Sequence, residues 1–205
     1  MGLVKKDTGL KTMDEILKYN RRFVQEKKYE SYQTGKFPKR KLAVLTCMDT
    51  RLTELLPAAL GLKNGDAKMI RNAGGVISDP YGSEIKSLLT AIYELGVNQI
   101  IVIGHTDCGA EKMDSALMVE KMLMRKIKKE DIKKTGSRGI APSEWLCGIS
   151  SAEKAVGDSV LLLRNHPLIP EDVGIFGFVM DTRTGELMKI NESDGVDSAI
   201  GAAVS

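Results

Sequence analysis

Short apolar runs alternate along the chain with segments whose apolar residues recur at helical spacing. The runs are bounded by turn-forming residues, and they predict strands at 42–46, 67–70, 99–104, 173–180 and 187–190. The segments with helical spacing are 52–60, 83–95, 110–134 and 142–163, and Gly148 and Gly157 are candidate interruptions of the last one. Because helical segments separate the strands, the pattern predicts right-handed βαβ units and a parallel sheet.

Two local patterns refine this sheet. The run Ile100–Ile103 is apolar at every position, as expected of an interior parallel strand that is covered on both faces. Residues 181–186 predict a hairpin turn, which places the last strand antiparallel at an edge of the sheet. We therefore expect an α/β fold of three layers, with a mostly parallel sheet and helices on both faces.

Signals at the helix ends add detail. Thr12 and Glu15 have the spacing of a capping box and predict a helix from Met13 to Lys27. Its apolar stripe is narrow, so we expect it to be buried against this subunit or a partner. Ser83 is the expected N-cap of the helix that follows it. The glycines at 136–139 are typical of a mobile loop.

Length, composition and charge limit the number of domains and the classes of partner that we expect. The 205 residues predict a single domain over 1–205, with an N-terminal helical arm at about 12–28. No apolar run is long enough to cross a bilayer, and the net charge of +3 is too small to imply a nucleic-acid partner. The first residues lack a secretory signal and the three cysteines show no disulfide spacing, so we expect a cytoplasmic protein with no membrane partner.

Residues that bind metal ions follow two of the predicted strands. Cys47 ends the first strand, and His105 and Cys108 follow the strand at 99–104. Two sulfurs and one imidazole suit Zn²⁺ in tetrahedral geometry, so we predict that the two strand ends meet around one zinc ion. In catalytic zinc sites the fourth position holds a water molecule whose pKa falls far enough for it to act as a hydroxide nucleophile.

Asp49 and Arg51 decide what such a site can do. Asp49 can take the fourth position as a ligand in a closed state, or it can accept a hydrogen bond from the zinc-bound water. A bidentate pair with Arg51 would hold the carboxylate off the metal and keep it ionised. Without that pair, ligation by Asp49 would close the site against water.

Five other residues have simpler interpretations. Cys147 and His166 have no companions of ligand type nearby in sequence, and we interpret both as structural. Asp107 is expected to cap the turn after its strand. Arg71 and Asn72 are either turn residues or supports of the site loop. The glycines that follow them do not indicate a nucleotide site, because no Walker-type Lys-Ser/Thr follows.

The sequence resembles the β-class carbonic anhydrases, most closely their shorter prokaryotic members. The family signature, Cys-x-Asp-x-Arg followed by His-x-x-Cys, is matched by Cys47, Asp49, Arg51, His105 and Cys108. The similarity covers most of 42–190. It implies strand order 2-1-3-4 with an antiparallel edge strand 5, a homodimer or dimer-based oligomer, and zinc-dependent reversible hydration of CO₂ to bicarbonate by a zinc lyase.

The resemblance also implies residue roles. In the family the Cys, His and Cys bind zinc, and the Asp–Arg dyad gates the fourth position. The amide after the second Cys, here Gly109, helps to orient the substrate. Before Cys47 we find no counterpart of the glutamine that binds CO₂ or bicarbonate in plant-type members, and the segment 113–139 is longer than in the shortest members.

Two other functions fit the same residues. One is a COS or CS₂ hydrolase that uses the same zinc site on a different electrophile. The other is a non-catalytic scaffold stabilised by zinc, in which Asp49 permanently closes the site.

Overall fold

A five-stranded sheet in the order β2-β1-β3-β4-β5 organises the larger part of the structure, a computed structural model that describes residues 7–135 and 141–190. Strands β1 to β4 are parallel, and β5 runs antiparallel to β4. The strands are β1 Leu42–Cys47, β2 Ala67–Asn72, β3 Gln99–His105, β4 Gly174–Met180 and β5 Leu187–Lys189. The predicted fold class, strand order and antiparallel edge strand are confirmed.

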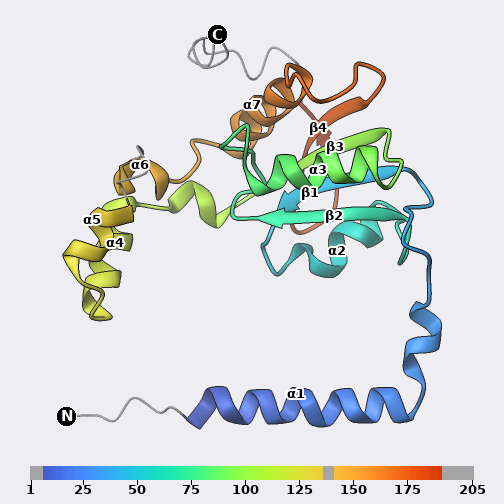
Figure 1. Ribbon diagram of the computed structural model, residues 1–205, viewed down its shortest axis with the longest axis horizontal. Coiled ribbons are helices and arrows are strands. Elements are labelled where there is room, and N and C mark those ends of the chain that lie inside the picture. The colour runs from blue at the N-terminus through green and yellow to red at the C-terminus, as the bar shows by residue number, and fades with distance from the viewer. Residues whose placement is uncertain (1–6, 136–140, 191–205) are drawn as a thin grey trace. The chain divides into compact units, whose positions relative to one another are not determined.

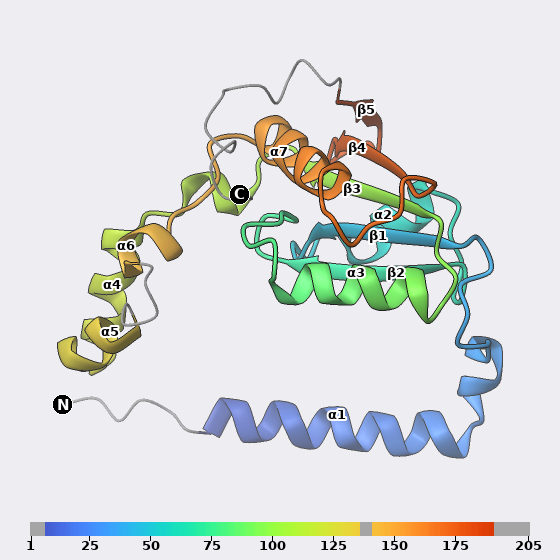
Figure 2. The same ribbon diagram turned by 45° about the horizontal axis from the view of Figure 1, so that its top comes forward.

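Helices cover both faces of this sheet, as Figures 1 and 2 show together. On one face, α2 (Leu52–Ala59) buries its leucines against the sheet; on the other, α3 (Ser83–Tyr93) and α7 (Ala152–Arg164) do the same. The two faces hold separate apolar clusters, so the molecule has the three layers predicted. Strand β1 lies between β2 and β3 and is almost wholly buried, which explains why its sequence is apolar without alternation.

The register of β1 and β3 brings their carboxyl ends to the same edge of the sheet. Thr46 lies opposite Ile103, and its buried Oγ1 donates a hydrogen bond of 2.8 Å to the Ile103 carbonyl. The residues that leave the sheet after these two positions therefore start side by side. This is the edge at which the ligand-type side chains were expected.

Two glycines let α7 lie close to the sheet. A Cβ on Gly177 would stand 2.8 Å from Val156 Cγ1, and one on Gly104 would stand 2.9 Å from Val156 Cγ2. Both distances are shorter than packed side chains allow. The helix thus packs directly against the backbone of β3 and β4.

The predicted helix at 110–134 is wrong in its continuity. The chain forms three shorter helices there: η2 (Gly109–Lys112), α4 (Ser115–Met124) and α5 (Lys129–Thr135). Asp114 starts α4, because its carboxylate accepts hydrogen bonds from the amides of Ala116 and Leu117. After α4, Lys126 adopts a φ of 67°, which a continuous helix cannot contain.

The predicted helix at 142–163 is also divided. It consists of the short α6 (Pro142–Trp145) and of α7, whose N-cap Ser151 accepts a hydrogen bond from the amide of Lys154. Gly148 lies between these two helices, as expected, whereas Gly157 lies inside α7 and does not interrupt it. The expected loop at 136–139 falls outside the described residues.

The N-terminal part of the chain forms a separate compact unit that ends at Lys36. It contains α1 (Asp7–Gln25) and η1 (Lys28–Tyr32). The capping box at Thr12 is wrong, because the helix begins at Asp7 and Thr12 lies inside it. Ser83 is likewise not an N-cap, since Gly82 occupies that position of α3.

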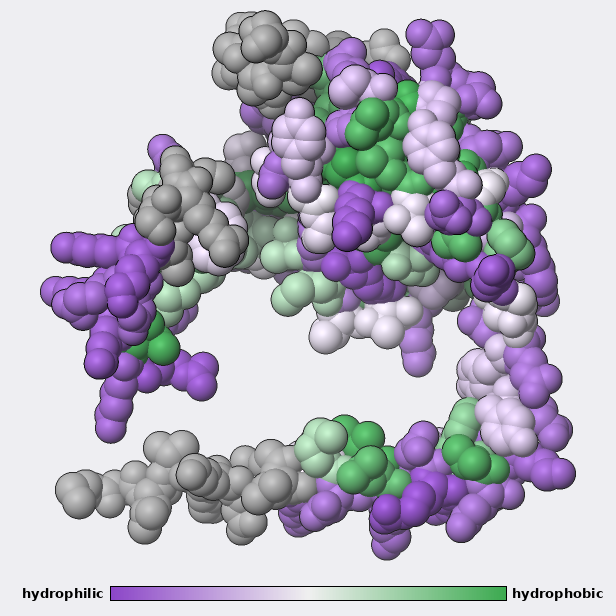
Figure 3. Space-filling view, viewed as in Figure 1, coloured by the Kyte–Doolittle hydropathy of each residue, from purple (hydrophilic) through white to green (hydrophobic). Residues whose placement is uncertain are grey.

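Helix α1 carries apolar side chains along one side, as Figure 3 shows. About half of the surface of Ile16 and of Leu17 is exposed, so the described part of the N-terminal unit does not itself cover this stripe. No helix among the described residues is both long and apolar enough to span a membrane.

Candidate metal centre

Cys47, His105 and Cys108 come together at the carboxyl ends of β1 and β3. All three side chains are buried, and their potential ligand atoms lie within 4.8 Å of one another. The two Sγ atoms are 3.9 Å apart. Among the described residues, this is the group of His, Cys and acidic side chains with the geometry to hold a metal ion. The convergence predicted from the sequence is therefore present.

The His105 ring is oriented for metal binding. Its Nδ1 lies 3.0 Å from the Thr106 carbonyl, which is an acceptor, so in the neutral ring Nδ1 carries the proton. Nε2 then carries a free lone pair, and this buried atom has no hydrogen-bond partner among the described residues. Buried polar atoms are rarely left unpartnered, and an imidazole fixed by a carbonyl at its other nitrogen is the usual arrangement of a ligand histidine. The residues present therefore fit a bound metal ion.

The two thiols differ in acidity. Burial raises the pKa of Cys47, but contacts with His105 and with the backbone amides of Asp49 and Gly74 outweigh it, so the pKa is lowered. Burial raises the pKa of Cys108, and a charge on Cys47 raises it further. Cys47 is thus the first thiolate to form, and a cation placed between the sulfurs would be needed to deprotonate both.

The carboxylate of Asp49 is held by the guanidinium of Arg51 in a bidentate pair. Arg51 Nη2 donates to Oδ2 at 2.8 Å and Nε donates to Oδ1 at 3.0 Å, while the Arg51 amide donates to Oδ1 at 2.9 Å. These contacts lower the pKa of Asp49 to about 2, against an opposing effect of burial. Asp49 Oδ2 is still only 3.9 Å from His105 Nε2. The carboxylate is therefore ionised, next to the ligand group, and turned toward Arg51.

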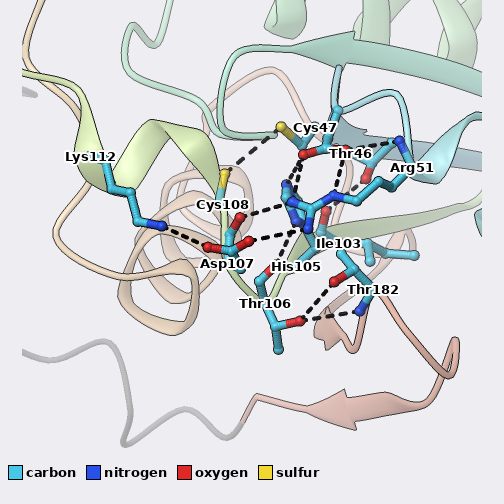
Figure 4. A network of polar contacts seen from close by, with 11 residues as sticks. Thr46, Cys47, Arg51, Ile103, His105, Thr106, Asp107, Cys108, Lys112 and Thr182 are labelled. Carbon is cyan, nitrogen blue, oxygen red and sulfur yellow. Dashed lines mark hydrogen bonds and ion pairs between the residues drawn. The ribbon is translucent and has the colours of Figure 1, made fainter.

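Asp107 does not cap the turn in the way predicted. It adopts a φ of 52°, and its side chain faces Arg51 and Lys112 instead (Figure 4). Oδ2 accepts from Arg51 Nη1 at 3.3 Å and Oδ1 accepts from Lys112 Nζ at 2.7 Å. No sequence pattern pointed to Lys112, because its contact with Asp107 depends on the turn that starts η2.

The loop after β2 supports the site from the other side. The Asn72 amide donates to the carbonyl of Val76 at 2.6 Å and to Glu84 Oε1 at 2.9 Å, and its Oδ1 accepts from the Val76 amide at 3.1 Å. Gly75 fits tightly, since a Cβ there would stand 2.6 Å from the backbone nitrogen of Cys47. Of the two interpretations of Asn72, loop support is thus correct.

Arg71, Cys147 and His166 lie outside the ligand group. Arg71 Nη2 donates to the carbonyl of Leu52 at 3.1 Å and so ties β2 to the start of α2. Both ring nitrogens of His166 have partners, the Leu168 amide and the Pro80 carbonyl. Cys147 is exposed and donates to a backbone carbonyl. These contacts agree with structural roles.

Comparison with known proteins identifies the family of the chain. The sequence profile of the family described as "Carbonic anhydrase" matches residues 42–187. A Bacillus subtilis protein named "Putative carbonic anhydrase YvdA" is 46% identical over 176 residues, which cover 86% of this chain and 89% of that protein. The crystal structure of β-carbonic anhydrase isoform I from Trichomonas vaginalis has a TM-score of 0.77 at 35% identity, and the match covers 87% of this chain and 96% of that one.

A third relative has a different name. A "Carbon disulfide hydrolase" from Acidianus is 33% identical over 165 residues, which cover 75% of this chain and 78% of that protein. The profile match and the identities together show that this chain belongs to the carbonic anhydrase family, in its β class. It is thus a member of an enzyme family, and the resemblance on which the sequence prediction rested is confirmed.

Proposed function

We propose that this protein is a zinc-dependent carbonic anhydrase, a lyase that interconverts CO₂ and bicarbonate: CO₂ + H₂O ⇌ HCO₃⁻ + H⁺. The observation that carries the proposal is the unpartnered Nε2 of His105, buried beside two thiols and next to the pair formed by Asp49 and Arg51. Membership of the family supports the reaction.

In this proposal Cys47, His105 and Cys108 would hold the zinc ion. Zinc bound there would supply a Lewis acid that lowers the pKa of a water molecule enough for it to attack CO₂ at a mildly alkaline pH of about 8.5. Arg51 keeps Asp49 ionised and turned away from the ligand group, so the carboxylate can accept a hydrogen bond from that water without displacing it.

Gly109 has the proposed role of orienting the substrate through its amide. It directly follows Cys108, and a Cβ on it would meet nothing within 4 Å. Packing among the described residues therefore does not require a glycine at this position, which leaves room beside the backbone for a small ligand such as CO₂ or bicarbonate.

A direct assay tests this function. Protein loaded with one zinc per chain should hydrate CO₂ well above the buffer rate at pH about 8.5, where the proposed nucleophile is formed. His105→Ala should bind zinc more weakly and lose the activity. Stoichiometric zinc together with no hydration above buffer would overturn the proposal.

A second candidate function uses the same site on CS₂ or COS. The identity of 33% to a carbon disulfide hydrolase favours testing it. Both compounds present the same electrophilic carbon with sulfur in place of oxygen, so the same residues would serve. Release of sulfide from CS₂ or COS, at a kcat/KM that exceeds the value for CO₂ hydration, would favour this function over the first.

The proposal also covers assembly, compartment and domain organisation. We propose one catalytic domain with the helical arm at about 12–28, acting as a homodimer or a dimer-based oligomer. The apolar stripe of α1, which the described part of the N-terminal unit leaves about half-exposed, supports self-association. A cytoplasmic location is proposed because two thiol ligands have to stay reduced to bind metal.

A further inference from the structure

Arg51 donates hydrogen bonds to two aspartates, Asp49 and Asp107. On one side its Nε and Nη2 donate to the carboxylate of Asp49. On the other side its Nη1 donates to Asp107 Oδ2 at 3.3 Å, and its Nη2 donates to the Asp107 backbone carbonyl at 2.9 Å (Figure 4). One guanidinium therefore joins the strand end of β1 to the turn between His105 and Cys108.

The backbone conformation of Asp107 makes its two contacts with Arg51 possible. A φ of 52° lies in the left-handed region, which aspartate and asparagine enter more readily than most residues. In this conformation both the side chain and the carbonyl of Asp107 reach Arg51. The neighbouring Thr106 is fixed in turn, since its amide donates to the Met180 carbonyl at 3.0 Å.

Lys112 determines which oxygen of Asp107 is available to Arg51. Its Nζ lies 2.7 Å from Oδ1, so each carboxylate oxygen of Asp107 faces one cation. Lys112 belongs to η2, the turn of helix that follows the ligand Cys108. A series of ion pairs, Lys112–Asp107–Arg51–Asp49, thus connects an exposed lysine to the carboxylate that lies next to the ligand group.

We propose that Asp107 is a positioning residue, which holds Arg51 in the orientation that keeps the Asp49 carboxylate away from the metal and so leaves the fourth position free. This inference rests on the proposed function. The Arg51 side chain is 41% exposed and has many rotamers, so without Asp107 it would adopt orientations that engage Asp49 less well. Asp49 would then be free to approach the metal.

The test reads the fourth position directly. The protein is loaded with Co²⁺ in place of zinc, and azide is titrated at one fixed pH while the Co²⁺ absorption spectrum is recorded. Azide binds where a ligand can enter, so ligation by Asp49 lowers its apparent affinity. Asp107→Asn and Asp107→Gly are the variants, since both residues tolerate a positive φ.

We expect azide affinity to fall roughly three- to fivefold in both variants, the size that the loss of one partly exposed charged contact allows. The direction is diagnostic: removal of a negative charge alone would strengthen the binding of an anion. Asp131→Asn is the matched control, because Asp131 pairs with Lys134 in α5 and lies outside the ligand group. It should leave azide affinity unchanged.

A double-mutant cycle shows whether Asp107 acts through Asp49. In an Asp49→Asn background, Asp107→Asn should leave azide affinity equal or slightly higher, because no carboxylate is left to compete. The inference would be overturned if both Asp107 variants that retain Asp49 bound azide as tightly as wild type or more tightly. It would also be overturned if Asp107→Asn lowered azide affinity equally with Asp49 and with Asn at position 49.

The experiment separates this inference from the proposed function. If the zinc protein hydrates CO₂ and the Asp107 variants bind azide as wild type does, the positioning role fails alone. If the zinc protein does not hydrate CO₂ but the azide shift appears, the positioning role stands and the proposed function fails.

Discussion

Arg51 is the residue on which the proposed gate depends. Replacing it with alanine removes both side-chain donors to Asp49 and leaves only the backbone amide at 2.9 Å. We expect Arg51→Ala to lose about a hundredfold or more in kcat/KM for CO₂, because the carboxylate becomes a competitor for the fourth position. Arg51→Lys should recover little, since an ammonium cannot form the bidentate pair.

The measurement is stopped-flow CO₂ hydration, with the zinc content determined for each variant. Arg40→Ala is the matched control, because Arg40 donates to the Gly61 carbonyl and pairs with Asp66, away from the ligand group. Wild-type kcat/KM in Arg51→Ala at full zinc content would show that the Asp49–Arg51 pair is not needed.

Glu84 links the site loop to α3, and this contact should depend on pH. Burial raises the pKa of Glu84, but its hydrogen bonds, with Asn72 first among them, lower it below the ordinary value of 4.5. A carboxyl whose pKa is lower in the folded state stabilises the fold above its unfolded pKa and loses this effect as the pH falls through the folded pKa. The stabilising effect is thus complete above pH about 4.5.

We therefore expect Glu84→Gln to lower the free energy of unfolding at pH 7 and to lower it less as the pH drops below about 4.5. Urea unfolding of metal-free wild type and variant at several pH values measures this difference. The same substitution in an Asn72→Ala background should cost less at pH 7. A difference that stays constant down to pH 3 would contradict the assignment.

The residues of the candidate site differ in how far the sequence could predict them. Cys47, His105 and Cys108 follow two parallel strands, so their convergence follows from sheet geometry once these two strands are adjacent. Asp107 was predicted to cap the turn after its strand, but its side chain contacts Arg51 and Lys112. The left-handed backbone that turns it toward them cannot be recognised from the spacing of apolar residues. Contacts across irregular turns need the structure.

At the scale of elements, the close packing of α7 on the sheet leaves no room for a side chain at position 177. A Cβ on Gly177 would stand 2.8 Å from Val156 Cγ1 and 3.0 Å from Val160 Cγ2. Gly177→Ala should therefore lower the free energy of unfolding by roughly 1–3 kcal/mol, the usual cost of overpacking a core. Gly35→Ala is the control, because a Cβ there meets nothing within 4 Å, and it should change stability by less than about 0.5 kcal/mol.

Chemical denaturation of both variants measures these costs. The cost of Gly177→Ala should be smaller in a Val156→Ala background, in which the clashing methyl group is absent. Equal stability of Gly177→Ala and wild type would mean that α7 can move outward at no cost. The close packing of α7 would then not constrain the sheet.

Strands were predictable from apolar runs, whereas the helices were predictable only in part. The segments 110–134 and 142–163 keep helical periodicity across points where the chain breaks. The breaks lie at Asp114 and Ser151, whose side chains cap new helices, and at Lys126, whose φ is positive. Periodicity reports which face is apolar, and it does not report where one helix ends and another begins.

Strand order belongs to the scale of the whole molecule, and the residue pattern alone did not determine it. The alternation of strands and helices allowed several parallel orders. The order 2-1-3-4-5 came from the resemblance to the β-class carbonic anhydrases, and the sheet has this order. Strand order decides the site, because only adjacency of β1 and β3 brings Cys47 to His105 and Cys108.

Self-association through α1 is the prediction that concerns the whole molecule. Ile16 and Leu17 lie on an apolar stripe of α1 that the described part of the N-terminal unit leaves about half-exposed, and such a stripe loses its unfavourable contact with water when a second copy covers it. We expect the wild-type protein to sediment as a dimer or a larger even-numbered species. The double variant Ile16→Ser/Leu17→Ser should shift it toward monomer by at least about tenfold in Kd, since two apolar side chains no longer contribute.

Lys18→Ser/Arg21→Ser is the matched control, because it places the same residue type on other positions of the same helix. Analytical ultracentrifugation over a range of concentrations gives the Kd of each variant, and circular dichroism checks that helix content is equal. A wild-type Kd in both double variants would show that the apolar stripe of α1 does not drive assembly. An equal increase of Kd in both variants would point instead to the stability of the helix and not to its apolar face.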